Sequence, residues 1–143
     1  MWFPTLDQQE CRRPIILLHL RAASGAVVFL DVLVDTGSDV TLLPVDAAES
    51  LQCDLEGIEE IVVESLVGGE CRYRPAVIEC ELRRLPEVIR WNAKIGFVDR
   101  EMRYGIVGTR GFLEFFRLTY DASECWLDLM PKEDRGVSAT TTD

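Results

Sequence analysis

The sequence has one histidine, His19, and none of its five cysteines forms a Cys-x-x-Cys pair. Zinc sites and redox motifs are built from closely spaced cysteine and histidine side chains, so neither kind of site is predicted. A Cys-His nucleophilic pair would depend on His19, which lies in an apolar, strand-like run without supporting spacing. The thiols are interpreted as reduced, partly buried side chains of a cytoplasmic protein.

Long apolar runs and clustered basic residues are also missing. No run approaches the roughly 20 apolar residues that cross a bilayer, and the N-terminus lacks a basic start followed by an apolar stretch. We therefore expect a soluble, unexported chain. Lys and Arg number 15 against 25 Asp and Glu, which gives a formal net charge of −10. Nucleic acids and anionic membranes both favour clustered Lys and Arg, so neither is expected as a partner.

What the sequence does contain is typical of one globular domain. Its 143 residues are 48% hydrophobic and 28% charged, enough to bury a core. The predicted domain covers residues 13–130, and residues 1–12 form an N-terminal arm. Residues 131–143 have almost no apolar side chain to bury, so they are expected to form a flexible, frayed C-terminal tail.

The hydrophobic pattern predicts a mainly β fold with roughly six to eight short strands. The first two runs predict a hairpin, because small residues and Gly25 separate them. Short helices are expected after Pro44 and over residues 112–116, whose aromatic side chains suit the core. A closed or sandwiched sheet follows from the spacing. The predicted strands cover residues 13–20, 26–34, 40–44, 61–67, 70–82, 93–98, 117–121 and 125–130.

One apolar run ends in a carboxylate. Residues 30–38 read LDVLVDTGS, so a strand that should be buried leads directly into Asp35. An unpaired buried carboxylate costs several kcal/mol, and a chain keeps one only with compensation or for chemistry. Asp35 is therefore either a catalytic group or a structural acid that caps a turn with Thr36 and Ser38.

The surroundings of this acid carry a resemblance. The triplet 35–37 (Asp-Thr-Gly) follows FLDVLV and precedes Ser38 and the apolar run 40–44, and Ile106–Gly108 comes later, before a short helix. This ensemble resembles the retropepsin-like aspartic proteases over about residues 13–130. The resemblance implies a retropepsin-like closed β-barrel or sandwich, hydrolysis of a peptide or protein substrate, and no cofactor or metal.

The chemistry of peptide hydrolysis agrees with this resemblance. One group must take a proton from the attacking water while another protonates the carbonyl oxygen, and two adjoining carboxylates that share one proton do both. The sequence contains one Asp-Thr-Gly and no second copy of the motif. The other aspartate must then come from another copy of the chain, which predicts a C2 homodimer with two Asp35 side chains on its axis.

The resemblance also implies roles for the neighbours of Asp35. The Thr36 hydroxyl reaches across the dimer to brace the two loops, and the Gly37 N–H faces the carboxylate. Ser38 donates a hydrogen bond to Asp35 and favours its ionisation. Asp39 holds the substrate backbone, although a merely solvent-facing acid is the alternative.

Two further stretches bear on the resemblance. Gly68 and Gly69 fall where relatives place the flap, a hairpin that closes over substrate, and an ordinary hairpin turn is the alternative. The family's usual arginine after its second apolar pair is displaced by one position here, to Arg110 within Gly108–Gly111. Its supporting role in the dimer is therefore not carried over.

Two rival functions remain open. A catalytically silent retropepsin-like dimer could bind a peptide or a protein with the same sheet, although the intact Asp-Thr-Gly-Ser favours the enzyme. A reduced-thiol sensor acting through Cys53 or Cys125 is the second rival.

Overall fold

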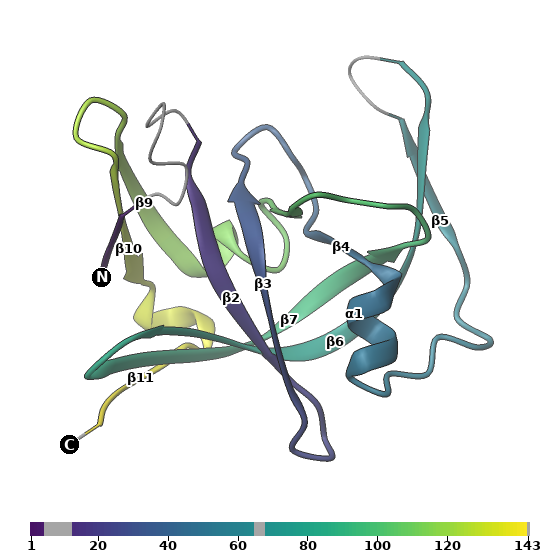
Figure 1. The fold of residues 1–143 in the computed structure, drawn as a ribbon, viewed down its shortest axis with the longest axis horizontal. Helices are drawn as coiled ribbons and strands as arrows, with labels where there is room; N and C mark the ends of the chain where they lie inside the picture. Colours follow the sequence, from purple (N-terminus) through teal and green to yellow (C-terminus); the bar gives the residue numbers. More distant parts are fainter. Residues whose placement is uncertain (5–12, 65–67, 143) are drawn as a thin grey trace.

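The structure is a computed structural model, and it describes residues 1–4, 13–64 and 68–142. Most of these residues lie in β-strands, as Figure 1 shows. The strands are β1 (Trp2–Pro4), β2 (Ile15–Arg21), β3 (Val27–Val34), β4 (Leu42–Pro44), β5 (Ile61–Glu64), β6 (Glu70–Arg84), β7 (Glu87–Val98), β8 (Gly105–Val107), β9 (Phe116–Asp121), β10 (Trp126–Pro131) and β11 (Ser138–Thr141). The helical elements are α1 (Val45–Ser50) and the 3-10 turns η1 (Leu113–Phe115) and η2 (Glu133–Arg135).

Within the described residues, six strands close into a β-barrel. Their order is β7-β4-β8-β3-β2-β6, and β6 pairs with β7 to complete the ring. The β3–β8 and β4–β7 pairs are parallel, whereas the remaining pairs of the ring are antiparallel. The predicted mainly β, closed, retropepsin-like fold is confirmed.

The first hairpin of the barrel forms where the sequence predicts it. β2 and β3 pair from Ile15 opposite Leu33 to Arg21 opposite Val27. The turn contains Gly25 with a φ of 89°, a left-handed conformation that glycine adopts without steric cost. Alternate side chains of β2 are buried in the barrel, as the period of a strand requires.

The β6–β7 hairpin is longer than the sequence pattern indicates. The pattern predicts that the first strand ends at residue 82 and that the second begins at residue 93, whereas β6 runs to Arg84 and β7 begins at Glu87. Val88, Ile89 and Trp91 are buried in this missed part of β7. Charged and polar residues between them hid the strand, because its apolar positions do not form one continuous run.

An aromatic cluster joins β7 to the segment after β8. The Trp91 ring meets Phe112 and Phe116 edge to face, at centroid distances of 5.7 and 4.9 Å. The indole Nε1 donates a hydrogen bond to the Gly111 carbonyl at 2.9 Å. Both phenylalanines are buried, which confirms them as core, and the helix expected there is the short turn η1.

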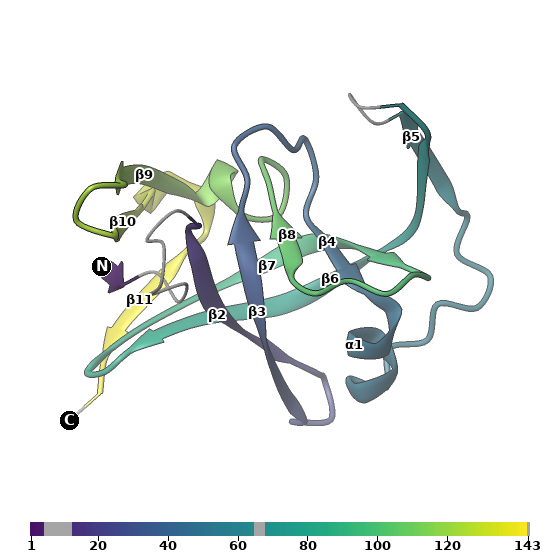
Figure 2. The same ribbon diagram turned by 45° about the horizontal axis from the view of Figure 1, so that its top comes forward.

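A three-stranded sheet, ordered β1-β10-β9, packs beside the barrel (Figures 1 and 2). Leu127 and Leu129 on β10 are fully buried, as is most of Phe3 on β1. Part of the expected N-terminal arm is therefore a strand of this sheet. Residues 5–12 lie outside the described residues.

The prediction of a frayed C-terminal tail is wrong for the described part of residues 131–143. After η2, β11 pairs antiparallel with the start of β7, with Ser138 opposite Arg90 and Thr141 opposite Glu87. The N–H of Thr142 also donates to the Pro86 carbonyl at 2.7 Å. The tail is ordered by main-chain pairing to an open strand edge, a stabilisation that needs few apolar side chains.

The cysteines only partly match expectation. Cys53 and Cys71 are free and half-buried, and Cys80 is free and fully buried. Cys125, by contrast, is disulfide-bonded, so the interpretation of all thiols as reduced is wrong for this residue.

Candidate active site

Asp35 lies at the first position after β3, where the chain turns before β4. β3 runs parallel to β8, and Val34 lies opposite Val107. The Asp35 N–H donates to the Val107 carbonyl at 2.9 Å, which continues the pairing by one step. The strand therefore delivers Asp35 to the rim of the barrel, where it is half-buried, rather than into the core. The loop stands at the end of β3 in Figures 1 and 2.

The Asp35 loop is a tight turn closed by its own groups. The Gly37 N–H donates to Asp35 Oδ1 at 2.9 Å, which is the contact that the family resemblance implies. The Ser38 N–H donates to the Asp35 carbonyl at 3.2 Å. A Cβ atom on residue 37 would lie 3.3 Å from Asp35 Oδ1, closer than most side chains tolerate. Glycine therefore lets the backbone approach the carboxylate.

Ser38 does not make the expected hydrogen bond. Its hydroxyl donates to the Val40 carbonyl at 2.7 Å, not to the Asp35 carboxylate. The Val40 carbonyl is only two residues further along the chain, so the Ser38 hydroxyl can reach it within the turn. Ser38 thus shapes the return of the chain toward β4.

Thr36 and Asp39 are both exposed on the loop. Within the part of the chain that the structure describes, the Thr36 hydroxyl makes no hydrogen bond and the Asp39 carboxylate makes no ion pair. Both groups lie at the surface, where another molecule can reach them. Their expected roles, bracing a dimer and holding substrate, stay predictions.

A second segment, the 107–111 turn, interlocks with the Asp35 loop. The Thr109 N–H donates to the Ser38 carbonyl at 2.9 Å, and the Arg110 N–H donates to the Asp39 carbonyl at 3.0 Å. Val40 and Arg110 form an isolated parallel bridge. The displaced arginine therefore supports the loop through its main chain.

Gly108 allows this interlocking. A Cβ atom at this position would lie 2.4 Å from the Ser38 carbonyl oxygen and 2.5 Å from that of Val40. Both neighbours are main-chain atoms of the loop, so they cannot move aside as a flexible side chain would. The apolar-apolar-glycine motif at 106–108 thus has a direct steric reason.

The sequence analysis missed Thr41 as a residue of the site. Its side chain is 1% exposed in a mainly apolar environment. The Thr41 Oγ1 donates to the Arg110 carbonyl at 2.7 Å and accepts from the Gly108 N–H at 3.2 Å. The available signal was a hydroxyl inside the apolar run VTLLP, since a buried hydroxyl needs partners.

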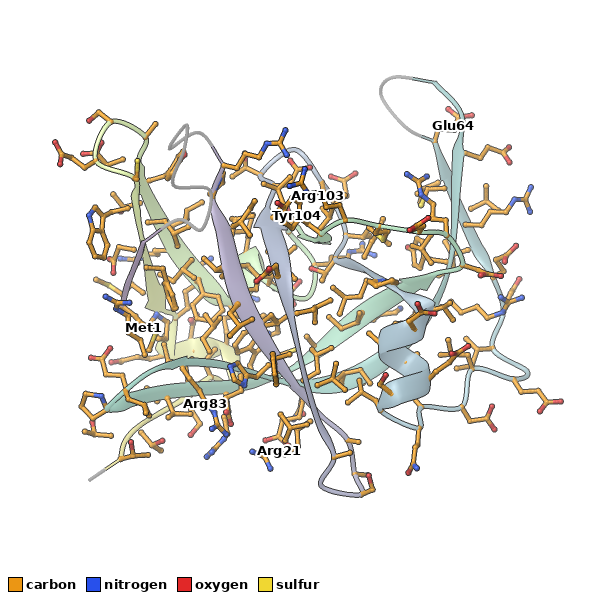
Figure 3. All side chains as sticks on the ribbon, viewed as in Figure 1. Met1, Arg21, Glu64, Arg83, Arg103 and Tyr104 are labelled. Carbon is orange, nitrogen blue, oxygen red and sulfur yellow. The ribbon has the colours of Figure 1, made fainter. Side chains whose placement is uncertain are left out.

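The β5–β6 hairpin rises on the same side of the barrel as the Asp35 loop (Figures 1 and 2). Gly68 and Gly69 have φ values of 91° and 86° and nothing within 4 Å of an added Cβ. Residues 65–67 of the tip lie outside the described residues. Glu64 lies directly opposite Glu70 where the described pairing ends (Figure 3), and like charges in this position weaken it. A covering role over substrate stays a prediction.

The base of this hairpin is anchored to the barrel. Tyr73 is buried with Leu42 and Val98. Its ring lies over Gly96, because an added Cβ there would be 2.5 Å from Tyr73 Cδ2. The hairpin therefore projects from a fixed base beside the Asp35 loop.

The two arginines of the hairpin are paired with acids of the same region. Arg72 contacts Glu70 at 3.0 Å and Glu60 at 3.4 Å, and Arg74 contacts Glu60 at 3.4 Å.

In the described residues, no basic side chain forms an ion pair with Asp35, so its carboxylate is available for chemistry.

No group of three or more His, Cys, Asp or Glu side chains in the described ranges is placed to hold a metal ion. None of the helices in those ranges is long and apolar enough to cross a membrane.

The fold is similar to a known crystal structure, that of a retropepsin-like aspartic protease from Rickettsia conorii. The two share 17% sequence identity with a TM-score of 0.57, and the match covers 89% of this chain and 95% of the other. At this identity the likeness shows the fold. The sequence matches no protein-family model and no curated protein.

Proposed function

We propose that this protein is an aspartic endopeptidase that works as a homodimer. The observation that carries the proposal is the Asp35 loop itself, in which a half-buried carboxylate is oriented by the Gly37 N–H and locked by the 107–111 turn. The alternative, a structural acid that caps the turn with Thr36 and Ser38, has less support in the described residues, because the Ser38 hydroxyl donates to Val40 and the Thr36 hydroxyl makes no hydrogen bond. In the described residues the Asp35 carboxylate bonds only within its own turn.

The proposed reaction needs two copies of Asp35. One carboxylate, in its charged form, takes a proton from the attacking water, while the protonated partner donates to the peptide carbonyl oxygen. The Gly37 N–H fixes one carboxylate oxygen, so the other is left to face the water. The exposed Thr36 and Asp39 would contact the second copy and the substrate backbone, respectively.

The test compares wild type with Asp35→Asn on a mixed peptide library between about pH 3 and pH 8. We expect wild type to cleave best below neutral pH, where one carboxylate of the pair is protonated. Asp35→Asn should keep its fold and lose at least about a hundredfold in kcat/KM.

Asp31→Asn is the matched control, because Asp31 is an exposed acid on the same strand. This variant should cleave like wild type. Turnover by Asp35→Asn at the wild-type rate, or cleavage that keeps rising into alkaline solution, would refute the assignment.

The same experiment addresses the first rival, and the state of the cysteines bears on the second. Saturable peptide binding by wild type without any cleavage would favour the silent binding module. The thiol sensor has less support, because burial and then the charge of Asp54 raise the pKa of Cys53, which lowers its thiolate fraction. Cys125 is disulfide-bonded.

A further inference from the structure

A buried carboxylate lies on the outer side of the barrel, away from the Asp35 loop. Glu81 on β6 is opposite His19 on β2 and Arg90 on β7. Its side chain is only 3% exposed, although its neighbours on this face are partly exposed. A buried charge of this kind must be compensated by opposite charge and hydrogen bonds.

Three arginines compensate Glu81. Arg83 donates from Nε to one carboxylate oxygen, and Arg90 donates from Nε to the other at 2.6 Å. Arg21 Nη2 lies 3.7 Å from the same oxygen as Arg90. Burial alone would raise the pKa of Glu81, but the hydrogen bonds and charges of Arg83 and Arg90 outweigh it, so the pKa lies below its ordinary value. Glu81 is therefore charged near neutral pH.

The three arginines carry more hydrogen-bond donors than the Glu81 carboxylate uses. The Arg21 side chain is 32% exposed, that of Arg83 is 38% exposed, and that of Arg90 is 40% exposed. In the described part of the chain, the terminal Nη groups of Arg83 and Arg90 donate to no protein group. Glu81 holds these guanidinium groups in place while their outer donors face solvent. Figure 3 shows Arg21 and Arg83 beside each other below the sheet, on the side away from the Asp35 loop.

The excess of positive charge is confined to the immediate surroundings of Glu81. Three guanidinium groups surround one carboxylate, whereas the whole chain carries a formal net charge of −10. The other acids on this face are Glu79, opposite Arg21, and Asp31, opposite Leu17. At physiological salt, the attraction between two exposed charges is largely screened beyond about 8–10 Å. An anionic group must therefore contact the arginines directly to be attracted.

Exposed apolar side chains flank the arginines on β2 and β3. Phe29 is 66% exposed, and Leu17 and Val27 are each 40% exposed. The Phe29 ring lies 5.8 Å from the ring of His19. Burial and then the charge of Arg83 lower the pKa of His19, against an opposing effect of Glu81, so its ring adds little positive charge at neutral pH. The face thus combines fixed guanidinium donors with an apolar strip.

We propose that this arginine face, formed by Arg21, Arg83, Arg90 and the flanking Phe29, binds an acidic segment of another protein. Carboxylate side chains would accept from the free guanidinium donors, while apolar side chains cover Phe29. A two-fold contact centred on this face is disfavoured, because its axis would bring the arginines of the two copies against each other. The face lies apart from Asp35, so the proposal does not depend on peptidase activity.

The test measures fluorescence anisotropy of a labelled peptide in which Asp and Glu alternate with Phe and Leu, using the full chain. We expect saturable binding that weakens as salt is raised. The matched peptide with Asn and Gln should bind at least about tenfold more weakly. Inorganic phosphate at the same concentration should not displace the acidic peptide. Equal binding of the two peptides, or full displacement by phosphate, would overturn the proposal.

Variants separate binding from folding. Arg21→Gln and Phe29→Ser should each weaken binding about fivefold with little change in the thermal midpoint, because both side chains are partly exposed. Arg100→Gln, an exposed arginine in the loop after β7, is the control and should bind like wild type.

Glu81→Gln gives the decisive contrast. Removing the central negative charge should lower the thermal midpoint and yet tighten binding of the acidic peptide, because the guanidinium groups lose their internal partner. A purely structural role predicts the lower midpoint without tighter binding. That result, or an unchanged affinity of Arg21→Gln, would contradict the proposal.

Discussion

The Thr41 hydroxyl is the side-chain group that joins the two halves of the candidate site. It accepts from the Gly108 N–H and donates to the Arg110 carbonyl, both in the 107–111 turn. We expect Thr41→Val to lower the free energy of unfolding by about 2 kcal/mol, because it leaves two main-chain groups without partners in a buried place. Urea unfolding measures this change.

Thr41→Ser is the matched control, since it keeps the hydroxyl and removes a methyl group. Its stability should lie closer to wild type than that of Thr41→Val. If peptidase activity is present, kcat should fall in Thr41→Val with KM little changed and recover in Thr41→Ser. Equal loss of stability in both variants would show that packing of the methyl group, and not the hydroxyl, matters at residue 41.

Glu81 makes stability depend on pH. Its pKa in the folded protein is below the ordinary unfolded value of about 4.3, because Arg83 and Arg90 outweigh the effect of burial. Its contribution is therefore fully present above the unfolded pKa and is lost as pH falls through the folded pKa. We expect Glu81→Gln to be less stable at pH 7 and to lose less stability between pH 7 and pH 3, as measured by urea unfolding at each pH.

Glu79→Gln controls for the general effect of removing an acid from β6. Within the described residues Glu79 forms no ion pair, so this variant should follow the wild-type loss of stability in acid. A Glu81→Gln curve parallel to wild type would rule out Glu81 as a source of the acid sensitivity.

At the scale of elements, β11 protects the start of β7. Its pairing runs from Ser138 opposite Arg90 to Thr141 opposite Glu87. We expect deletion of residues 138–143 to lower the free energy of unfolding by about 1–3 kcal/mol, because main-chain hydrogen bonds along β7 lose their partners. Hydrogen exchange should show faster exchange at residues 88–90.

Ser138→Ala keeps the β11 backbone and serves as the control, with exchange close to wild type. The deleted protein should also associate more readily, since an uncovered strand edge pairs with other chains. Unchanged protection of β7 in the deletion variant would show that β11 does not pair stably in solution.

The elements that the sequence predicts well are those whose signal is local. Alternating apolar residues and Gly25 predict the β2–β3 hairpin, and the motif at residues 35–37 predicts the turn after β3. The first half of β7 and the whole of β11 were missed. β7 hides its strand period behind polar residues, and β11 depends on the strand edge against which it pairs, which no local pattern reveals.

In the candidate site, too, the sequence predicts the residues of a local motif but not their hydrogen-bond partners elsewhere in the fold. The sequence identifies Asp35 and the glycine next to it, because the motif is contiguous. It does not show that the Ser38 hydroxyl bonds Val40, or that Thr41 bonds a turn near residue 110. These partners are set by how the loop and the turn meet in space, so only the structure provides them.

For the whole molecule, the proposal that catalysis needs two copies of Asp35 has a direct consequence. We expect an equal mixture of wild type and Asp35→Asn, allowed to exchange subunits, to show about half the activity of the same amount of wild type alone. Mixed dimers contain a single intact aspartate and cannot share a proton between two carboxylates. Initial rates of peptide cleavage measure this loss.

Mixing with Asp31→Asn is the control and should cause no such loss, because each of its chains retains Asp35. An activity that is unaffected by Asp35→Asn at every ratio, together with a monomer in sedimentation, would contradict the dimer. The cytoplasmic location expected from the sequence stays a prediction.

The interlocking of the Asp35 loop with the 107–111 turn also bears on biosynthesis. The ribosome makes the loop early and its locking turn much later, so a nascent chain that ends before Val107 contains Asp35 but lacks the hydrogen bonds that hold its loop against the 107–111 turn. The loop can therefore be locked only after residues 107–110 have emerged from the ribosome. For the proposed peptidase, this order of assembly would keep incomplete translation products inert, whatever the concentration at which they accumulate.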